Sequence, residues 1–378
     1  MEESISLTNI IHRSLTVNGR FLLVWYQNGK VYIITDRFGL VPLFFGQKNG
    51  TVILITDLEA TLLKNLDYEI RDLQLLDPKD YLVIDAETGK LSAVPKSKLL
   101  IPKLLHPEEI IVQNLATLVE QVILNSVKGL DKVAVLLSGG VDSTTLCYVL
   151  KKHQVNFQAY VVGRPDSHDV QAAQQAATVL DFPLRTVFID HHTVEKKLHT
   201  VEKVIQTKLF RQTTRTVPAG VTIAVAITYF FGMQRAAIDG FRVILTSIGT
   251  EELFAGFEQY DKTLTIEKLC LTKAFTIHQR DIYRDYRLGQ YFNMNVIMPF
   301  LSLTLARYAL GIPGDLKVKD GIKKNIWRKA AMVIGVPAEF ASRPNKATQY
   351  GSKTNRILEK IARKNGYRYI RDLIETEL

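Results

Sequence analysis

Cysteine and long apolar runs are both scarce in this chain of 378 residues. Its two cysteines, Cys147 and Cys270, are too few for a disulfide framework or a four-thiolate zinc site. The most apolar stretch, residues 221–233, is interrupted by threonine and tyrosine and is shorter than the roughly 20 residues that cross a bilayer. The first ten residues include two acids and no apolar segment, which predicts no secretory signal. We therefore expect a cytoplasmic protein with no membrane partner.

The chain has fewer acidic than basic residues, and the excess of basic residues is concentrated in one segment. The net charge is +10, and residues 317–371 contain 15 Lys and Arg against three acids, so the remainder carries −2. Such a segment could bind nucleic acid, but aromatic residues are sparse in it and no RNA-binding motif is present. A segment that faces polyphosphate explains the charge at least as well, so we do not expect a nucleic-acid partner.

The most informative stretch is residues 132–150, KVAVLLSGGVDSTTLCYVL. A β-branched apolar run ends at Leu137 and a helix can begin near Thr144, so the segment between them is a strand-to-helix turn. Two glycines let the backbone approach a ligand, and the helix start offers unpaired N–H groups to an anion. A carboxylate in such a cradle implies Mg²⁺ between it and the phosphates. We expect the whole turn to bind nucleotide: Ser138, Gly139, Gly140, Val141, Asp142 and Ser143. The alternative is an ordinary glycine-rich turn.

The segments before and after this turn differ in pattern. Short apolar strands separated by Asn-Gly turns predict an antiparallel β-rich domain over residues 1–95, followed by a linker over 96–107. From residue 108 to 378, strands alternate with helices, which predicts an α/β domain with a doubly wound parallel sheet. Ligands of such sheets lie at the carboxyl ends of the strands.

The Ser-Gly-Gly-Val-Asp-Ser order resembles the pyrophosphate-binding loop of N-type ATP pyrophosphatases, whose fold is like that of the adenine nucleotide α hydrolases. Residues 19–21, 36–45 and 57–60 are similar to the later part of the glutaminase domain of class II amidotransferases. In the asparagine synthetase family such a domain precedes such a loop. The resemblance implies a truncated domain of the N-terminal-nucleophile glutaminase type followed by a synthetase domain.

The glutaminase half departs from the family pattern. The family's nucleophile is a cysteine at the first position of the mature chain, whereas this chain begins Met-Glu-Glu-Ser and has no cysteine before Cys147. The family's first strands are also missing. We predict a structural remnant without glutaminase activity. A misassigned start codon, or a separate glutaminase chain that supplies the missing half, is the alternative.

A second family signature follows a strand that ends at Leu245. Residues 246–257, TSIGTEELFAGF, resemble a Gly-Glu-Gly-Ser-Asp-Glu turn that meets pyrophosphate and its magnesium. The family's metal aspartate aligns with Glu251, which can still ligate Mg²⁺, and Ser247 and Gly249 belong to the turn. The family's turn glutamate aligns with Ile248, which cannot serve as an acid, base or anion partner. A capped helix start is the alternative reading.

Three further sites are implied by the resemblance. Val162 and Gly163 end a strand where the family places adenine, although a plain core strand would look the same. Lys324 matches the lysine that stabilises charge on the adenylate, and it is predicted to share a helix face with Arg328. Lys346 belongs to a loop, residues 343–352, that suits a lid over the phosphates. Four other residues are given structural roles: Asp169 as a helix N-cap, and Arg284, Asp285 and Ser302 as packing around the acceptor pocket.

The resemblance implies an amide ligase that uses ATP and Mg²⁺ and releases AMP and pyrophosphate. Its substrates would be an aspartate-like carboxylate, which is adenylated, and free ammonia. Lys324 and Glu251 are the catalytic candidates, and Asp142 and Glu251 are the metal candidates. Three alternatives stay open: another acceptor, as in β-lactam synthetases; a nucleotide-binding protein without turnover; and an RNA-modifying adenylase. A homodimer is also left open.

Overall fold

The structure is a computed structural model that describes residues 7–14, 16–58, 60–207, 210, 219–257, 265–344 and 346–377. The chain forms two compact units. The first comprises Met1–Leu100, Gln206–Val217 and Phe275–Tyr286. The second comprises Ile101–Ile205, Pro218–Ala274 and Arg287–Leu378.

The first unit differs in extent from the segment 1–95 assigned to it from the sequence. It reaches Leu100 because Lys96 is buried, with its ammonium donating to the carbonyls of Thr35 and Pro78 at 2.7 and 2.9 Å. Residues from the later part of the chain join it through aromatic packing, in which Tyr283 lies edge-on to Phe44 at 5.4 Å between ring centroids. These contacts join residues distant in sequence.

The first unit is built on two antiparallel sheets, ordered β1-β2-β6-β7 and β4-β3-β5. Asn28 and Gly29 both have positive φ, the backbone of the tight turn predicted between the first two strands. Gln27 pairs with Lys30 in that hairpin. Its elements are α1 (Leu7–Ser14), β1 (Leu22–Gln27), β2 (Lys30–Thr35), β3 (Phe44–Lys48), β4 (Thr51–Ile55), α2 (Ala60–Asn65), η1 (Ile70–Asp72), β5 (Gln74–Leu75), β6 (Asp80–Asp85), β7 (Leu91–Pro95) and η2 (Ile277–Gln279).

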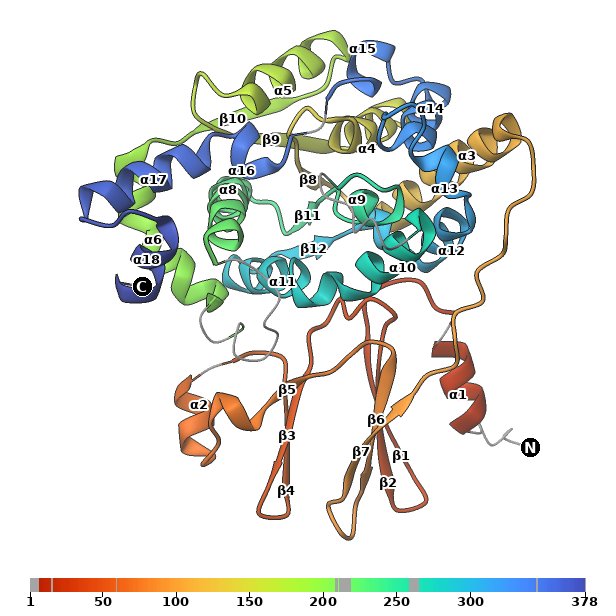
Figure 1. Ribbon diagram of the computed structural model, residues 1–378, viewed down its shortest axis with the longest axis vertical. Helices are drawn as coiled ribbons and strands as arrows, with labels where there is room; N and C mark the ends of the chain where they lie inside the picture. Colours follow the sequence, from red (N-terminus) through yellow and green to blue (C-terminus); the bar gives the residue numbers. More distant parts are fainter. Residues whose placement is uncertain are drawn as a thin grey trace. The chain divides into compact units, whose positions relative to one another are not determined.

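The second unit is built on a five-stranded parallel sheet of order β10-β9-β8-β11-β12. Its strands are β8 (Val133–Leu136), β9 (Phe157–Gly163), β10 (Leu184–Phe188), β11 (Val243–Leu245) and β12 (Asn295–Ile297). The chain runs outward to one edge through β9 and β10, then crosses to β11 on the other side of β8 (Figure 1). The carboxyl ends of β8 and β11 are therefore the switch point where ligands of open α/β sheets bind. The predicted α/β fold with a doubly wound parallel sheet after a β-rich region is confirmed.

Helices cover both faces of this sheet, with α4 and α5 on one side and α8 on the other (Figure 1). They are α3 (Glu108–Val127), α4 (Val141–Lys152), α5 (His168–Val179), α6 (His191–Ile205), α8 (Ala219–Ile238), α9 (Thr250–Leu253), α10 (Ile266–Thr276), α11 (Ile282–Tyr291), η3 (Pro299–Leu301), α12 (Leu303–Gly311), α13 (Gly314–Lys317), α14 (Asn325–Ile334), α15 (Ala338–Ala341), α16 (Thr348–Gly351), α17 (Thr354–Lys364) and α18 (Ile370–Glu377). Helices α10 and α11 cross the limits of the two units.

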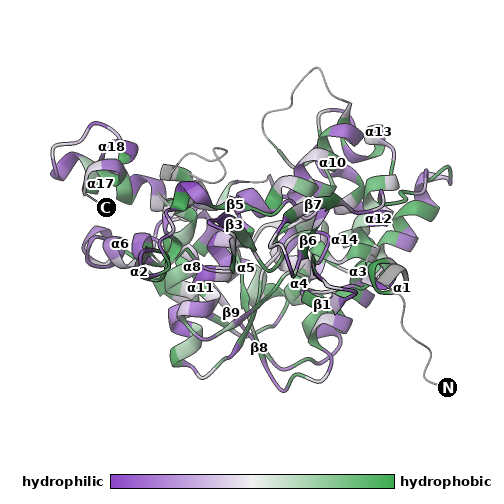
Figure 2. Cartoon of the chain, turned by 90° about the horizontal axis from the view of Figure 1, so that it is seen from below, coloured by the Kyte–Doolittle hydropathy of each residue, from purple (hydrophilic) through white to green (hydrophobic). Residues whose placement is uncertain are grey.

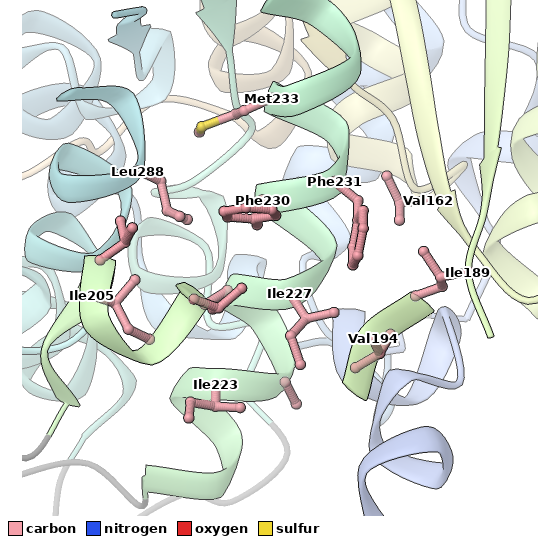
Figure 3. Close-up of a cluster of buried hydrophobic side chains, with 14 of the residues drawn as sticks. Val162, Ile189, Val194, Ile205, Ile223, Ile227, Phe230, Phe231, Met233 and Leu288 are labelled. Carbon is pink, nitrogen blue, oxygen red and sulfur yellow. The ribbon is translucent and has the colours of Figure 1, made fainter. Parts of the chain in front are cut away.

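The largest core of the second unit surrounds α8. Ile227, Phe230 and Phe231 point from this helix into a cluster that includes Val162 and Leu288 (Figure 3). Figure 2 shows the same layering, with hydrophobic strands β8 and β9 between helices that carry both hydrophobic and hydrophilic residues. Apolar side chains on several faces of α8 are thus explained by packing against β9, α6 and α17.

Two helices in the described ranges are long and apolar enough to cross a membrane, Glu108–Val127 and Gly220–Ile238. The expectation that the apolar stretch at 221–233 falls short of a span was wrong, because the helix continues to Ile238 and has 20 residues. In the most apolar window of each helix, the share buried inside the protein is 44% for Glu108–Val127 and 61% for Gly220–Ile238. Core helices satisfy the same test, so these two are weak evidence for a membrane.

Candidate functional site

The glycine-rich turn follows β8, as predicted, but the helix begins earlier than expected. Helix α4 starts at Val141 with Gly140 as its N-cap, so Asp142 and Ser143 lie in its first turn. Gly139 has φ of 74°, and a Cβ there would lie 2.6 Å from the backbone of Ala172 in α5. Glycine is therefore required at this position for two reasons: it allows the left-handed backbone, and it lets the loop pack against α5.

The two serines of the loop contact each other. Their hydroxyls are 3.1 Å apart, and the backbone N–H of Ser138 donates to Ser143 Oγ at 3.1 Å. The backbone N–H of Gly140 donates to Ser138 Oγ at 3.3 Å. Ser143 is only 1% exposed, so its hydroxyl fixes the shape of the loop in this structure. Val141 is fully buried and anchors the helix start.

Lys324 lies at the centre of the site, between the loop and the second signature. Its ammonium is fully buried and contacts three acceptors: Asp142 at 2.7 Å, Glu251 at 2.5 Å and the Thr250 hydroxyl at 3.2 Å. Burial alone would lower the pKa of Lys324, but the charges of Asp142 and Glu251 raise it above its ordinary value. Lys324 is therefore a fixed cation, and its three N–H donors each have an acceptor.

The prediction that Lys324 and Arg328 share one helix face was wrong. Lys324 has a φ of 55° and is the N-cap of α14, which begins at Asn325. The guanidinium of Arg328 instead donates to the carbonyls of Lys323, Ala341 and Arg343 at 3.0, 2.6 and 2.8 Å. Arg328 thus holds the segment that follows α15 against the start of α14.

The second signature supports this arrangement. Gly249 has a φ of 110° and is the N-cap of the short helix α9, which presents Thr250 and Glu251. A Cβ at Gly249 would lie 2.8 Å from Leu301, so glycine is needed for packing as well. A side chain at Gly256 would overlap the side chains of Glu251 and Lys324. The carboxylate and the ammonium meet in the space that this glycine leaves.

A pocket opens beside the loop, at the ends of β8, β9 and β11. Ser138, Val162 and Ser247 are predicted site residues that line it. Its other lining residues are Leu136, Leu137, Tyr160, Asp169, Thr228, Tyr229 and Thr348. Gly163 does not line it. A Cβ at Gly163 would lie 2.6 Å from the Ser167 hydroxyl and 3.2 Å from the Ser352 carbonyl, so packing is sufficient reason for this glycine.

Asp169 was predicted to cap a helix, but in the structure it lines the pocket and Ser167 is the cap. Ser167 is the N-cap of α5, and its hydroxyl accepts from the Val170 N–H at 3.4 Å. Asp169 is 6% exposed, and burial raises its pKa to about 7 against the opposing charges of Arg343 and Lys346. The pocket therefore contains a carboxyl group that exchanges a proton near neutral pH.

The loop after α15 brings two cations to this end of the sheet. Arg343 donates to the Gly139 carbonyl at 3.1 Å and to the His168 carbonyl at 3.3 Å. Burial has the largest effect on the pKa of both Asp169 and His168, raising the first and lowering the second. The charge of Lys346, whose side chain is exposed, lowers the pKa of both groups. Asn345, between them, is outside the described residues. The predicted lid segment thus contacts the phosphate loop through Arg343.

Comparison with known proteins agrees with this geometry. The family model for asparagine synthase matches residues 114–269 and 259–371, most of the second unit. The chain belongs to the asparagine synthase family. A putative glutamine-hydrolysing asparagine synthetase of Methanocaldococcus jannaschii is 24% identical over 93% of this chain and 72% of its own length. The bovine and mouse asparagine synthetases are both 26% identical, over 95% and 88% of this chain.

This asparagine synthase family chain spans only about two thirds of the length of the mammalian relatives, 66% of the bovine and 63% of the mouse protein. Two solved structures also show a likeness, a predicted tRNA methyltransferase subunit of Methanocaldococcus jannaschii and an NMN synthetase of Francisella tularensis. Their TM-scores are 0.25 and 0.27, identities 18% and 11%, and coverage 48% and 68% of this chain against 75% and 96% of theirs. Scores this low carry no argument.

Membership of the asparagine synthase family shows, at the family level, ATP-dependent amide ligase chemistry, and Mg²⁺ fits the residues present. One carboxylate oxygen of Asp142, Oδ1, is buried and has no hydrogen-bond partner among the described residues. Glu251 is 37% exposed at its side chain and lies on the same ammonium. The described part of the chain holds no cluster of three or more metal-ligating side chains. Two carboxylates together with substrate phosphates are a typical set of ligands for Mg²⁺.

Sequence reasoning named Asp169, Arg328 and the loop that contains Arg343, but it did not identify what these three residues contact. The spacing of Asp169 from Ser167 was noted, but only the position of the N-cap at Ser167 shows that Asp169 faces the pocket. Arg328 and Arg343 were visible as basic residues, yet their carbonyl partners lie 5 to 204 residues away. The position of Ser302 is also explained, since its hydroxyl caps α12 by accepting from the Leu305 N–H.

Proposed function

We propose that the second unit adenylates a carboxylate with Mg·ATP and transfers ammonia to the activated acyl group. The observation that carries this proposal is the buried Lys324 ammonium between Asp142 of the phosphate loop and Glu251 of the second signature. A cation fixed beside a phosphate-binding turn stabilises negative charge that develops during attack on phosphorus or on an adenylate.

The reaction proceeds in two steps. An oxygen of the substrate carboxylate bonds to the α-phosphorus of ATP, and the bond to the β-phosphate oxygen breaks, so pyrophosphate leaves. The nitrogen of ammonia then bonds to the acyl carbon, AMP leaves with the electrons of the acyl–oxygen bond, and the nitrogen loses a proton. Aspartate is the carboxylate we propose first, because the relatives are named asparagine synthetases and asparagine is the amide of aspartate.

Each group of the chain has a place in this scheme. The N–H groups at the start of α4, with Gly139, Gly140 and the Ser138 hydroxyl, would hold the pyrophosphate. Asp142 and Glu251 would hold Mg²⁺, which offsets phosphate charge when bound. Val162 and Ser247 line the pocket that would take the nucleoside. Lys324 would act as the fixed cation, and Arg343 and Lys346 would close over the phosphates.

A second acceptor class is favoured by one residue. Ile248 stands where the family pattern has a glutamate, and it is half-buried next to Gly249. An apolar side chain there offers no charge to orient an ammonium or an amine. An acceptor whose own amine attacks the adenylate, as in ring closure to a lactam, is therefore the second candidate.

Pyrophosphate release from Mg·ATP tests the proposal, with aspartate and with a panel of amino acids and β-amino acids, each with and without ammonium. We expect release that depends on one carboxylate and that Asp142→Asn reduces at least a hundredfold. Asp131→Asn is the matched control, because Asp131 is exposed on the same unit and loses the same charge. ATP binding without release for any acceptor would contradict the proposal and favour a silent nucleotide-binding protein.

The products separate the two candidates. Asparagine formed only when ammonium is present supports ammonia transfer to aspartate. Release that ignores ammonium and gives a cyclic amide supports the second candidate.

A further inference from the structure

Two helices of the second unit carry basic side chains along their solvent sides. On α6 the exposed positions recur at helical spacing and are His192, Lys196, His199 and Lys203. On α17 they are Arg356, Lys360 and Arg363. We call these seven residues the basic face. Spacings of four and three residues place each set in one stripe along its helix.

The two stripes adjoin each other. Helix α17 packs on α6, and Lys364 donates to both carboxylate oxygens of Glu195 at 3.0 and 2.8 Å. Glu195 is one turn from His192 and His199, and Lys364 is one turn from Lys360. The ion pair therefore joins the edges of the stripes. Both helices lie with α18 at one edge of the second unit (Figure 1).

The charge of the basic face is only partly offset by neighbouring acids. Within the described ranges, none of its seven residues has an ion pair with a carboxylate. Of the nearby acids, Glu195 pairs with Lys364 and Asp372 with Arg371, Glu359 accepts a hydrogen bond from the neutral amide of Asn355, and Asp190 interacts electrostatically with His191 and His192.

An exposed aromatic residue, Tyr369, follows α17 in the chain. Tyr369 is 51% exposed, and the guanidinium groups of Arg368 and Arg371 lie 5.2 and 5.9 Å from its ring centroid. An accessible ring held between arginines is a surface on which an unpaired base stacks while the arginines contact phosphate. A bilayer is a poor fit, since Ile357, Leu358 and Ile361 fill the apolar side of α17 and are at most 2% exposed.

We propose that the basic face, with Tyr369, binds a single-stranded nucleic acid, independently of the ATP site. The phosphates would contact the cations of α6 and α17, and a base would stack on Tyr369. Binding of this kind is salt-dependent and tolerates many sequences. RNA and DNA share the required chemistry, so the experiment includes both.

Fluorescence anisotropy tests the proposal with labelled oligouridylate and oligothymidylate of about 20 nucleotides, in the absence of ATP, between about 50 and about 200 mM KCl. We expect affinity to fall steeply with salt. The variant R356E/K360E/R363E should bind at least tenfold more weakly, with a salt slope shallower by about 0.7 for each lost phosphate contact. R356Q/K360Q/R363Q provides the same test with less repulsion, should the first variant fold poorly.

The matched control is K103E/K128E/K268E, which makes the same change in net charge at three exposed lysines of the same unit. It should keep most of the affinity. Tyr369→Ala should weaken binding of oligouridylate fivefold or more and leave binding of an abasic strand unchanged. Equal losses in the control and in the basic-face variant would overturn the proposal, as would no binding at the lowest salt. Binding only to vesicles with anionic lipid would overturn it in favour of a membrane surface.

Discussion

Single residues decide the chemistry of this protein, and Lys324 is the one with the most demanding surroundings. Its ammonium is out of contact with water, which is unfavourable unless opposite charges surround it. Asp142 and Glu251 supply those charges from two segments that are more than 100 residues apart in the chain. Removal of the lysine leaves two carboxylates facing one another.

Lys324→Met should therefore destabilise the protein by about 3 to 5 kcal/mol and abolish pyrophosphate release. The carboxylates left without a cation should bind Mg²⁺ more readily, so Mg²⁺ should raise the melting temperature of the variant more than that of the wild type. Thermal melts with and without Mg²⁺ measure this. The control is Lys329→Met on the same helix: Lys329 pairs with Glu108 but is 38% exposed, and we expect a loss below about 1 kcal/mol. Equal responses of wild type and Lys324→Met to Mg²⁺ would contradict the assignment of the metal ligands.

Asp169 makes stability depend on pH. Burial raises its pKa from 3.8 to about 7, so the folded protein favours the neutral carboxyl. The stability that this group contributes is complete below pH 3.8 and is lost as the pH rises through about 7. Asp169→Asn removes this dependence, and the wild type should lose on the order of 2 kcal/mol relative to the variant between pH 5 and pH 8.

Urea unfolding at both pH values measures that difference. Asp131→Asn, at an exposed position, should keep the pH dependence of the wild type. Parallel stability curves for wild type and Asp169→Asn would show that the carboxyl is already ionised at pH 5.

At the scale of elements, the phosphate loop shows what local sequence can and cannot predict. The strand before it and the helix after it follow from a β-branched run and from Gly140 as the N-cap, both of which are local features. The start of α4 at Val141 depends on burial of that valine, and the left-handed Gly139 depends on contact with α5. These contacts come from packing between distant segments, which the sequence pattern did not reveal.

Gly139→Ala should be far more harmful than a substitution at a glycine of the same backbone conformation. Gly139 and Gly129 have φ of 74° and 77°, but a Cβ at Gly129 would contact nothing within 4 Å. Gly129→Ala should destabilise by about 1 kcal/mol from backbone strain alone. Gly139→Ala adds a clash with the backbone of α5, so we expect at least about 2 kcal/mol more and weaker ATP binding. Denaturant unfolding and ATP titration of both variants measure the comparison, and equal losses would show that the loop does not depend on α5.

At the scale of the whole molecule, alternation of strands and helices was enough to predict the parallel sheet and the β-rich region before it. The sequence could not predict which segments make up the first unit, because Phe210 and Tyr283 come from two later segments of the chain. Their stacked rings, with centroids 4.4 Å apart, pack within this unit. The contacts of Asp169, Arg328 and Arg343 could not be predicted for a similar reason, since their partners are distant in sequence and only the fold brings them near.

The last prediction concerns the nitrogen donor. Both cysteines of this chain lie in the second unit and are buried, and burial raises the pKa of both Cys147 and Cys270, which disfavours the reactive thiolate. Glutamine hydrolysis by a thiol therefore has no suitable group in this chain. With its carboxylate substrate, the protein should turn over with ammonium and show no response to glutamine. Ammonia release from glutamine by the isolated chain, retained in a Cys147→Ala/Cys270→Ala variant, would reveal a hydrolytic group other than a thiol. The same release lost in that variant would show that a buried cysteine becomes accessible during turnover.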